Sequence, residues 1–305
     1  MLAHRPSAYR PNLAPFGRGG HTVTPVVALT IAGSDSGGGA GLQADLKTFA
    51  AHGVFGTCAV TAVTAQNTRS VDAVVVLDPD FVIAQIEAVV SDLAPKAVKT
   101  GMLATGAIVA AVAALADRGR LAHLVVDPVL VSSTGHRLVD DEGLEAYRTL
   151  LLPQAEVATP NLAEAAALTG QVLGDLGSLE AMVAAGETLR GLGVGTVVVK
   201  GGHLDVAAGG TGSTPSPDVV VGPRGSVVLA GERVATANDH GTGCSLAAAI
   251  AANLALGLEV PEAVSCAKDY VGRAIRGASG WRLGGGHGPI DHFGWSEHGG
   301  NEAKP

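Results

Sequence analysis

Short runs of β-branched residues alternate with longer stretches rich in alanine and leucine along most of this chain, and this alternation limits the possible folds more than any other feature. The pattern predicts strands at Val26–Ile31, Cys58–Val63, Val74–Leu77, Ala97–Thr100, Leu124–Asp127, Val157–Thr159 and Val197–Lys200. It predicts helices at Leu42–Ala51, Asp80–Asp92, Thr105–Arg118, Asp141–Leu151, Asn161–Leu168 and Leu179–Gly191. Such alternation indicates an α/β fold with a mainly parallel sheet. Several runs are apolar on both faces, which is typical of a sheet covered by helices on both sides.

The extent of the alternation predicts the organisation of the chain. We expect one doubly wound domain over residues 26–280, between a flexible N-terminal tail (1–25) and a glycine-rich C-terminal tail (281–305). Hydrophobic residues make up 47% of the chain, which is typical of a globular protein.

The last part of the domain has a different pattern. Residues 207–217 are of low complexity and predict a loose loop. Two β-type runs follow, Asp218–Val221 and Val227–Ala230, and the Gly/Pro turn between them predicts a small hairpin. Helices are then expected at Cys244–Leu256 and Pro261–Gly277.

Charge and cysteine content exclude several classes of protein. Twenty Lys and Arg residues against 28 Asp and Glu give a net charge of −8, with no basic stripe for nucleic acid. No apolar run is long enough to predict a membrane span or a signal peptide, so a cytoplasmic location is expected. Three scattered cysteines are too few for a disulfide framework or a zinc site.

Ligands of an open parallel sheet bind at the carboxyl ends of its strands, so polar residues just after strands are candidates. The first is the glycine-rich loop 32–41, which matches neither common nucleotide motif and is equally explained as a flexible turn. Asp45 follows near a helix start, where it either favours the helix dipole or, with Gln66, reads the edge of a heterocycle.

Three later strand ends carry charged or amide groups. Asp127 is a candidate metal ligand or catalytic acid, with a structural turn as the alternative. Asn161 and Glu164 form either a capping box or part of a site for phosphate and Mg²⁺. Lys200 places a cation beside two glycines.

The strongest local signal is the turn His240–Ser245, which leads into a helix. Gly241, Thr242 and Gly243 would expose backbone N–H groups as an anion hole for a transferring phosphoryl group. Cys244 would lie in the first helical turn, where the dipole is expected to lower the thiol pKa, so that the thiolate accepts a proton from a substrate hydroxyl. The alternative is a tight turn with a small buried cysteine.

These loops occur within a set of ordered segments that resembles a known family. The segments are ALTIAGSDSGGGAGLQADLKTF, TAVTAQNT, VKTGML, VDPVL, TPNLAEAAALTG, VKGGH, HGTGCSLAAAIA and the closing GHGPIDHF. On these segments the chain resembles the hydroxymethylpyrimidine/phosphomethylpyrimidine kinases of thiamine biosynthesis, within the ribokinase-like superfamily. The resemblance implies a three-layer fold with a small β-hairpin flap, and a homodimer.

The resemblance also implies a reaction and roles for individual residues. The reaction is transfer of the ATP γ-phosphoryl group to 4-amino-5-hydroxymethyl-2-methylpyrimidine, and then to its monophosphate. By similarity the pyrimidine would be contacted by Gly33, Asp45, Gln66, Met102 and Val129. The ATP phosphates and Mg²⁺ would be held by Lys200, Asn161, Glu164 and Asp127, beside the anion hole and Cys244.

Two alternatives stay open at this stage. A pyridoxal or pyridoxine kinase shares the HGTGC pattern, although Gln66 and Met102 favour an aminopyrimidine. A non-catalytic sensor of pyrimidines or nucleotides is the second alternative, and the joint presence of Lys200, Asn161, Glu164 and Cys244 argues against it.

Overall fold

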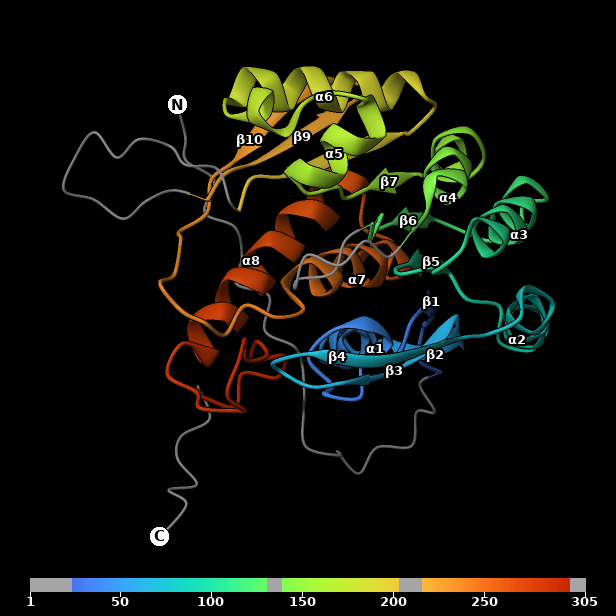
Figure 1. Cartoon of the computed structure of the whole chain (residues 1–305), viewed down its shortest axis with the longest axis horizontal. Coiled ribbons are helices and arrows are strands. Elements are labelled where there is room, and N and C mark those ends of the chain that lie inside the picture. The colour runs from blue at the N-terminus through green and yellow to red at the C-terminus, as the bar shows by residue number, and fades with distance from the viewer. Residues whose placement is uncertain (1–23, 131–138, 203–215, 297–305) are drawn as a thin grey trace, which may run out of the picture.

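The computed structural model describes residues 24–130, 139–202 and 216–296. Its main sheet has eight strands in the order β10-β9-β8-β7-β6-β5-β1-β2 (Figure 1). The strands are β1 (Val27–Ala32), β2 (Phe55–Val60), β5 (Ala97–Thr100), β6 (Leu124–Val126), β7 (Val157–Ala158), β8 (Thr196–Lys200), β9 (Asp218–Gly222) and β10 (Gly225–Leu229). Strands β2, β1, β5, β6, β7 and β8 pair in parallel, whereas β9 and β10 are antiparallel. The predicted, mainly parallel sheet is confirmed.

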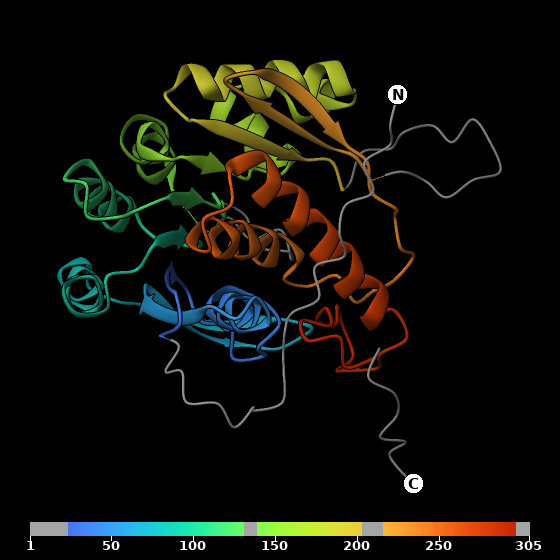
Figure 2. The same cartoon turned by 180° about the vertical axis from the view of Figure 1, so that it is seen from behind.

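Helices cover both faces of this sheet, as Figures 1 and 2 show from opposite sides. They are α1 (Gly41–Ala51), α2 (Pro79–Leu93), α3 (Gly106–Asp117), α4 (Asp141–Ala146), α5 (Leu162–Thr169), α6 (Leu179–Gly191), α7 (Thr242–Ala255) and α8 (Val260–Ala278). A π-helical turn, Tyr147–Leu151, continues α4. Alternate strand residues enter two separate cores: Ala97 packs with α1, α7 and α8, while its neighbour Val98 packs with the helices of the other face. The three-layer arrangement is therefore confirmed.

The prediction of one strand at Cys58–Val63 is wrong. The chain ends β2 at Val60 and begins β3 (Ala62–Gln66) two residues later, and β3 pairs with β4 (Val71–Val76) in a separate two-stranded sheet. Thr61 lies buried at the break and donates its hydroxyl to the Met102 carbonyl, at 2.6 Å. An unbroken apolar run gives no sign of this change of sheet.

The hairpin at residues 218–229 forms as predicted. It does not stand apart as the expected flap. β9 pairs with β8, so the hairpin extends the main sheet at its edge. The small antiparallel hairpin that stands outside the main sheet is β3–β4 (Figure 1).

The predicted C-terminal tail is wrong for residues 281–296. Ile290, Asp291 and His292 are buried, and the Asp291 backbone N–H donates to the Ala274 carbonyl of α8. The glycine-rich composition of this segment predicted a tail. Only a few of its residues are buried, and they are too few to change that composition. The N-terminal tail and the loop at 207–217 lie almost wholly outside the described residues. None of the helices in the described ranges is both long and apolar enough to cross a membrane.

Candidate active site

The carboxyl ends of the parallel strands and the N-terminus of α7 meet at one edge of the sheet. Lys200 ends β8, and its ammonium lies 2.9 Å from Asp127 Oδ1, at the end of β6. It also lies 3.8 Å from Glu164 Oε2, in the first turn of α5. Thr159 donates its hydroxyl to the same Asp127 oxygen at 3.0 Å. We call Lys200, Asp127 and Glu164 the outer cluster.

The outer cluster has an unusual charge balance. Burial alone would raise the pKa of Asp127, but the charges of Lys200 and Lys99 outweigh it and hold that pKa below its ordinary value. Burial and the Asp127 charge raise the pKa of Glu164 to about 7, although Lys200 opposes this shift. One cation is therefore shared by two carboxyl groups, of which one is only partly ionised near neutral pH.

Asn161 and Glu164 form the predicted capping box of α5. The Asn161 side chain accepts from the Glu164 N–H at 2.9 Å, and the Glu164 carboxyl accepts from the Asn161 N–H at 2.7 Å. The capping alternative is thus confirmed. It leaves a site role open, because the same carboxyl group also faces Lys200.

The turn before α7 is where the sequence predicts an anion hole. Gly241 has a φ of +86°, and a side chain there would collide with the Gly39 carbonyl, so only glycine fits. Gly243 lies in the first turn of α7, where an added Cβ would be 3.2 Å from the Lys200 ammonium. The start of α7 therefore lies beside the outer cluster, and the N-terminus of a helix favours an anion. Thr242 donates its hydroxyl to the Asp239 carbonyl at 2.6 Å, which holds the turn.

The predicted lowering of the Cys244 pKa by the helix start is wrong. Burial raises the pKa of this thiol to about 11, and the charges of Asp127 and Asp45 act in the same direction. The charge of Lys99 and a hydrogen bond with the Gly41 backbone oppose them, and the charge of Lys200 acts in the same opposing direction. The thiol is therefore protonated at neutral pH in the absence of ligands.

Asp45 lies in a second charged cluster that is fully buried. Its carboxylate accepts from the Lys99 ammonium at 2.8 and 3.0 Å and from the Thr30 hydroxyl at 2.6 Å. The Asp45 and Lys99 side chains have no exposed surface. Burial would lower the pKa of Lys99, but the Asp45 charge raises it above its ordinary value. This geometry disfavours the predicted contact between Asp45 and a substrate. We call Asp45, Lys99 and Thr30 the inner cluster.

Among the other predicted substrate residues, Gly33 and Met102 lie together, and Gln66 lies beside the loop that follows Gly33. A side chain at Gly33 would collide with Met102, so these two residues are in contact. Gln66 ends β3, and its backbone N–H donates to the Ser36 hydroxyl of the glycine-rich loop at 2.7 Å. Val129 lies partly buried, two residues after Asp127. Their contacts with a pyrimidine stay predictions.

Three residues of the site were not identified by sequence reasoning, namely Asp35, His240 and Lys99. The Asp35 carboxylate accepts from the N–H groups of Gly37, Gly39 and Ala40, and it lies 3.0 Å from His240 Nε2. This pair ties the glycine-rich loop to the start of α7. An acid followed by a serine and three glycines was a signal for such a turn, and a lysine inside an apolar strand was a signal for a buried pair.

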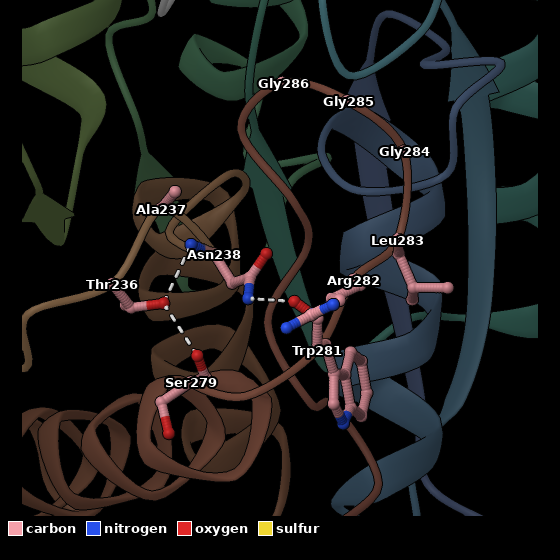
Figure 3. A pocket seen from close by; sticks show the side chains of 10 residues that line it. All are labelled: Thr236, Ala237, Asn238, Ser279, Trp281, Arg282, Leu283, Gly284, Gly285 and Gly286. Atoms are coloured by element: carbon pink, nitrogen blue, oxygen red, sulfur yellow. Dashed lines mark hydrogen bonds between the residues drawn. The ribbon is translucent and has the colours of Figure 1, made fainter.

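A cavity of about 420 Å³ lies beside the segment that leads into α7 (Figure 3). It is lined by Thr236, Ala237, Asn238, Ser279, Trp281, Arg282, Leu283, Gly284, Gly285 and Gly286. Asn238 spans its base and donates to the Trp281 carbonyl at 3.0 Å. None of the residues predicted for catalysis or binding lines this cavity.

Comparison with known proteins identifies the family. The family described as phosphomethylpyrimidine kinase matches residues 35–291. The chain belongs to this family. A hydroxymethylpyrimidine/phosphomethylpyrimidine kinase from Rhizobium meliloti is 48% identical over 268 residues, which cover 88% of this chain and 97% of the relative.

Two solved structures confirm the fold of this phosphomethylpyrimidine kinase family member. The phosphomethylpyrimidine kinase from Clostridium difficile has a TM-score of 0.70 and 40% identity, covering 82% of this chain and 99% of that one. The pyridoxal kinase from Bacillus subtilis, described as an ADP complex, has a TM-score of 0.78 and 36% identity, covering 88% and 98%. The predicted family, the ribokinase-like fold and the class of enzyme, a phosphotransferase, are confirmed. The alternative of a non-catalytic sensor is not favoured.

The residues of the outer cluster fit the Mg²⁺ that a kinase of this family would use. Mg²⁺ is commonly held by one or two carboxylates together with substrate phosphates and water. Asp127 and Glu164 supply two carboxyl groups around one lysine. Within the described ranges no three His, Cys, Asp or Glu side chains gather closely enough to hold a metal.

Proposed function

We propose that this kinase transfers the γ-phosphoryl group of ATP to the hydroxymethyl group of 4-amino-5-hydroxymethyl-2-methylpyrimidine, and then phosphorylates the monophosphate to the diphosphate, in thiamine biosynthesis. The observation that carries the proposal is the meeting of Lys200 with the N-terminus of α7, beside Asp127 and Glu164. The names of the curated relatives supply the substrate.

The phosphoryl group would lie between Lys200 and the turn of Gly241, Thr242 and Gly243. The Thr242 N–H would first have to leave the Asp239 carbonyl, to which it donates at 3.2 Å. Phosphoryl transfer passes through a loose transition state, so positioning and charge stabilisation supply most of the catalysis. Lys200 meets this need because its ammonium is fixed by Asp127 before the phosphates bind. Asp127 and Glu164 would hold Mg²⁺, which supplies neutralising charge on the phosphate oxygens.

Cys244 would accept the proton of the substrate hydroxyl. Its thiol is protonated at rest, since burial raises its pKa to about 11, so the reactive thiolate forms only in a small fraction of molecules. The charges of both Lys99 and Lys200 favour the thiolate. Because positioning and charge stabilisation supply most of the catalysis, the proton acceptor would contribute only part of the rate.

The pyrimidine would bind on the side of Gly33, Met102, Gln66 and Val129. Gly33 and Met102 are in contact and offer an apolar surface, whereas the Gln66 side-chain amide can pair with the amino and ring nitrogen atoms. Asp45 is assigned to holding Lys99 and not to the pyrimidine.

The direct test is an ATP-consumption assay with Mg²⁺ and three acceptors: the pyrimidine alcohol, its monophosphate and pyridoxal. We expect turnover with the first two and formation of the diphosphate. Pyridoxal is the second candidate, because a pyridoxal kinase is among the similar solved structures. Faster turnover of pyridoxal than of the pyrimidine alcohol would contradict the proposed substrate.

We also propose a cytoplasmic homodimer, with β3–β4 against a second copy of the chain. A two-stranded sheet alone is marginally stable, and Val63, Val74 and Val75 of this sheet are 47%, 45% and 63% exposed. Sedimentation should give a dimer that Val75→Glu weakens. A wild-type monomer at micromolar concentration would contradict the assembly.

A further inference from the structure

Residues 284–292, which we call the C-terminal strap, lie along the segment that enters α7. The His240 N–H donates to the Gly288 carbonyl, and the Gly288 N–H donates to the Ala237 carbonyl, both at 3.0 Å. Pro289 forms a β-bridge with His240. The strap therefore holds the turn that precedes the proposed anion hole.

The same strap reaches the turn of the β3–β4 hairpin. The N–H groups of Gly285 and Gly286 both lie 3.2 Å from the Thr68 hydroxyl, which accepts from them. A side chain at Gly286 would collide with the Thr68 carbonyl. Figure 3 shows Gly284 to Gly286 arching past the cavity. The strap thus connects the hairpin that carries Gln66 with the helix that carries Cys244.

The strap ends at His292, which contacts the first turn of α7. His292 Nε2 lies 3.1 Å from the Ser245 hydroxyl, and both side chains are buried. Ser245 directly follows Cys244, and its own N–H donates to the Gly241 carbonyl. The His292 carbonyl accepts from the Tyr270 hydroxyl of α8 at 3.0 Å, so the backbone of the histidine is also held in place.

The direction of this hydrogen bond follows from the state of the imidazole. Burial and the nearby charge of Lys47 lower the pKa of His292 to about 4, so the ring is neutral at pH 7. The ring also bonds the Ile290 backbone carbonyl. Because a carbonyl only accepts, the nitrogen facing it carries the proton. Nε2 is left to accept from the Ser245 hydroxyl.

We propose that His292 is a positioning residue for phosphoryl transfer: through Ser245 it fixes the N-terminal turn of α7, and with it the anion hole and Cys244. The inference rests on the proposed function, because it assigns the transfer site to that turn. Small displacements of reacting groups lower turnover strongly, and a hydrogen bond to the residue next to Cys244 is placed to prevent them.

The test is a comparison of kcat and KM for Ser245→Ala, His292→Ala and the double variant. Each single variant should lower kcat about 10- to 100-fold, while KM for the pyrimidine changes less than about threefold. The double variant should be no slower than the singles, since both remove one interaction. His292→Gln keeps a side-chain acceptor and should recover part of kcat.

Asn253→Ala is the matched control. Asn253 lies further along α7, is buried, and donates to the Ala263 carbonyl of α8 at 3.2 Å. Its loss should lower the thermal unfolding temperature without lowering kcat. Ser245→Ala is expected to fold, because alanine suits a helix and most residues around it in α7 are small and apolar.

Wild-type kcat in Ser245→Ala and His292→Ala, together with a lowered unfolding temperature, would overturn the inference and leave the strap a purely structural element. Failure of the proposed function would give a different result, because the wild-type enzyme itself would not phosphorylate the pyrimidine alcohol. If the wild type prefers pyridoxal, the same ratios measured with pyridoxal decide the inference.

Discussion

Lys99 lies in β5 and Lys200 ends β8 of the same sheet, yet the surroundings of the two lysines differ. Lys99 in the inner cluster has no exposed surface, and Asp45 and Thr30 complete a closed set of bonds. Lys200 in the outer cluster keeps 15% of its side chain exposed and stands beside a second carboxyl group at 3.8 Å.

This difference indicates that the two clusters have separate tasks, one structural and one in ligand binding. A closed buried pair contributes little net stability but is costly to break, so the inner cluster suits a fixed support whose Lys99 charge reaches Cys244. An open cluster with a surplus carboxyl group suits a ligand that brings its own charges, such as a metal–phosphate complex. The predictions below test this division.

The largest effect is expected on stability, from Lys99→Met. The variant leaves the Asp45 carboxylate buried without its cation, which typically costs about 3–5 kcal/mol. Denaturant unfolding measures the loss. The double variant Lys99→Met/Asp45→Leu should recover most of it, because two apolar side chains replace the pair. A double variant as unstable as the single one would show that the closed pair itself stabilises the fold.

Lys200→Met should act mainly on turnover. The variant removes one cation from the phosphoryl group, and losing one such donor typically lowers kcat about 10²- to 10³-fold. Folding should be less affected than in Lys99→Met, since Lys200 is partly exposed. Steady-state kinetics with saturating ATP measure the effect. Turnover within a factor of three of wild type would remove Lys200 from the mechanism.

Cys244→Ala tests the proton acceptor. We expect kcat to fall by about 10² with little change in pyrimidine affinity. Because the pKa of the thiol is about 11, wild-type kcat should rise with pH between 7 and 10, and the variant should lose this rise. A flat wild-type profile would mean that the anion hole acts without the thiolate.

The smallest effect concerns the pH dependence of stability. The folded pKa of Glu164, about 7, is raised above its ordinary value of 4.5. The folded state therefore favours the protonated acid, and stability from this group is present below pH 4.5 and is lost as the pH rises through 7. Glu164→Gln keeps a side-chain oxygen that can accept from the Asn161 N–H, but it cannot titrate, so it should remove this slope of stability against pH. Unfolding curves of both proteins between pH 4.5 and 8 measure it, and equal slopes would contradict it.

Sequence alone predicted the sheet, its helices and the family because each depends on local patterns. The strand ends placed Lys200, Asp127 and Glu164 correctly near one another, since parallel strands share a carboxyl edge. Sequence reasoning could not separate β2 from β3, because the chain changes sheet at Thr61, inside one apolar run.

The predicted lowering of the Cys244 pKa was wrong, and the Lys99 partner of Asp45 was missed, for a different reason. Asp45 pairs with Lys99, which is 54 residues away in the chain, so no local pattern shows that its carboxylate is already bound. The Cys244 pKa depends on burial and on Asp127 and Asp45, which outweigh the helix start that sequence reasoning relied on. Long-range charge and desolvation are set only by the folded structure.

The most direct test of the division between the clusters is kcat of Lys200→Met beside that of the refolded double variant Lys99→Met/Asp45→Leu, in one assay with the pyrimidine alcohol. Removing the neutral inner pair should leave turnover within about tenfold of wild type and KM nearly unchanged, whereas Lys200→Met should keep about 1% or less. A double variant as slow as Lys200→Met, or with a strongly raised KM, would contradict the account and return Asp45 to the substrate site.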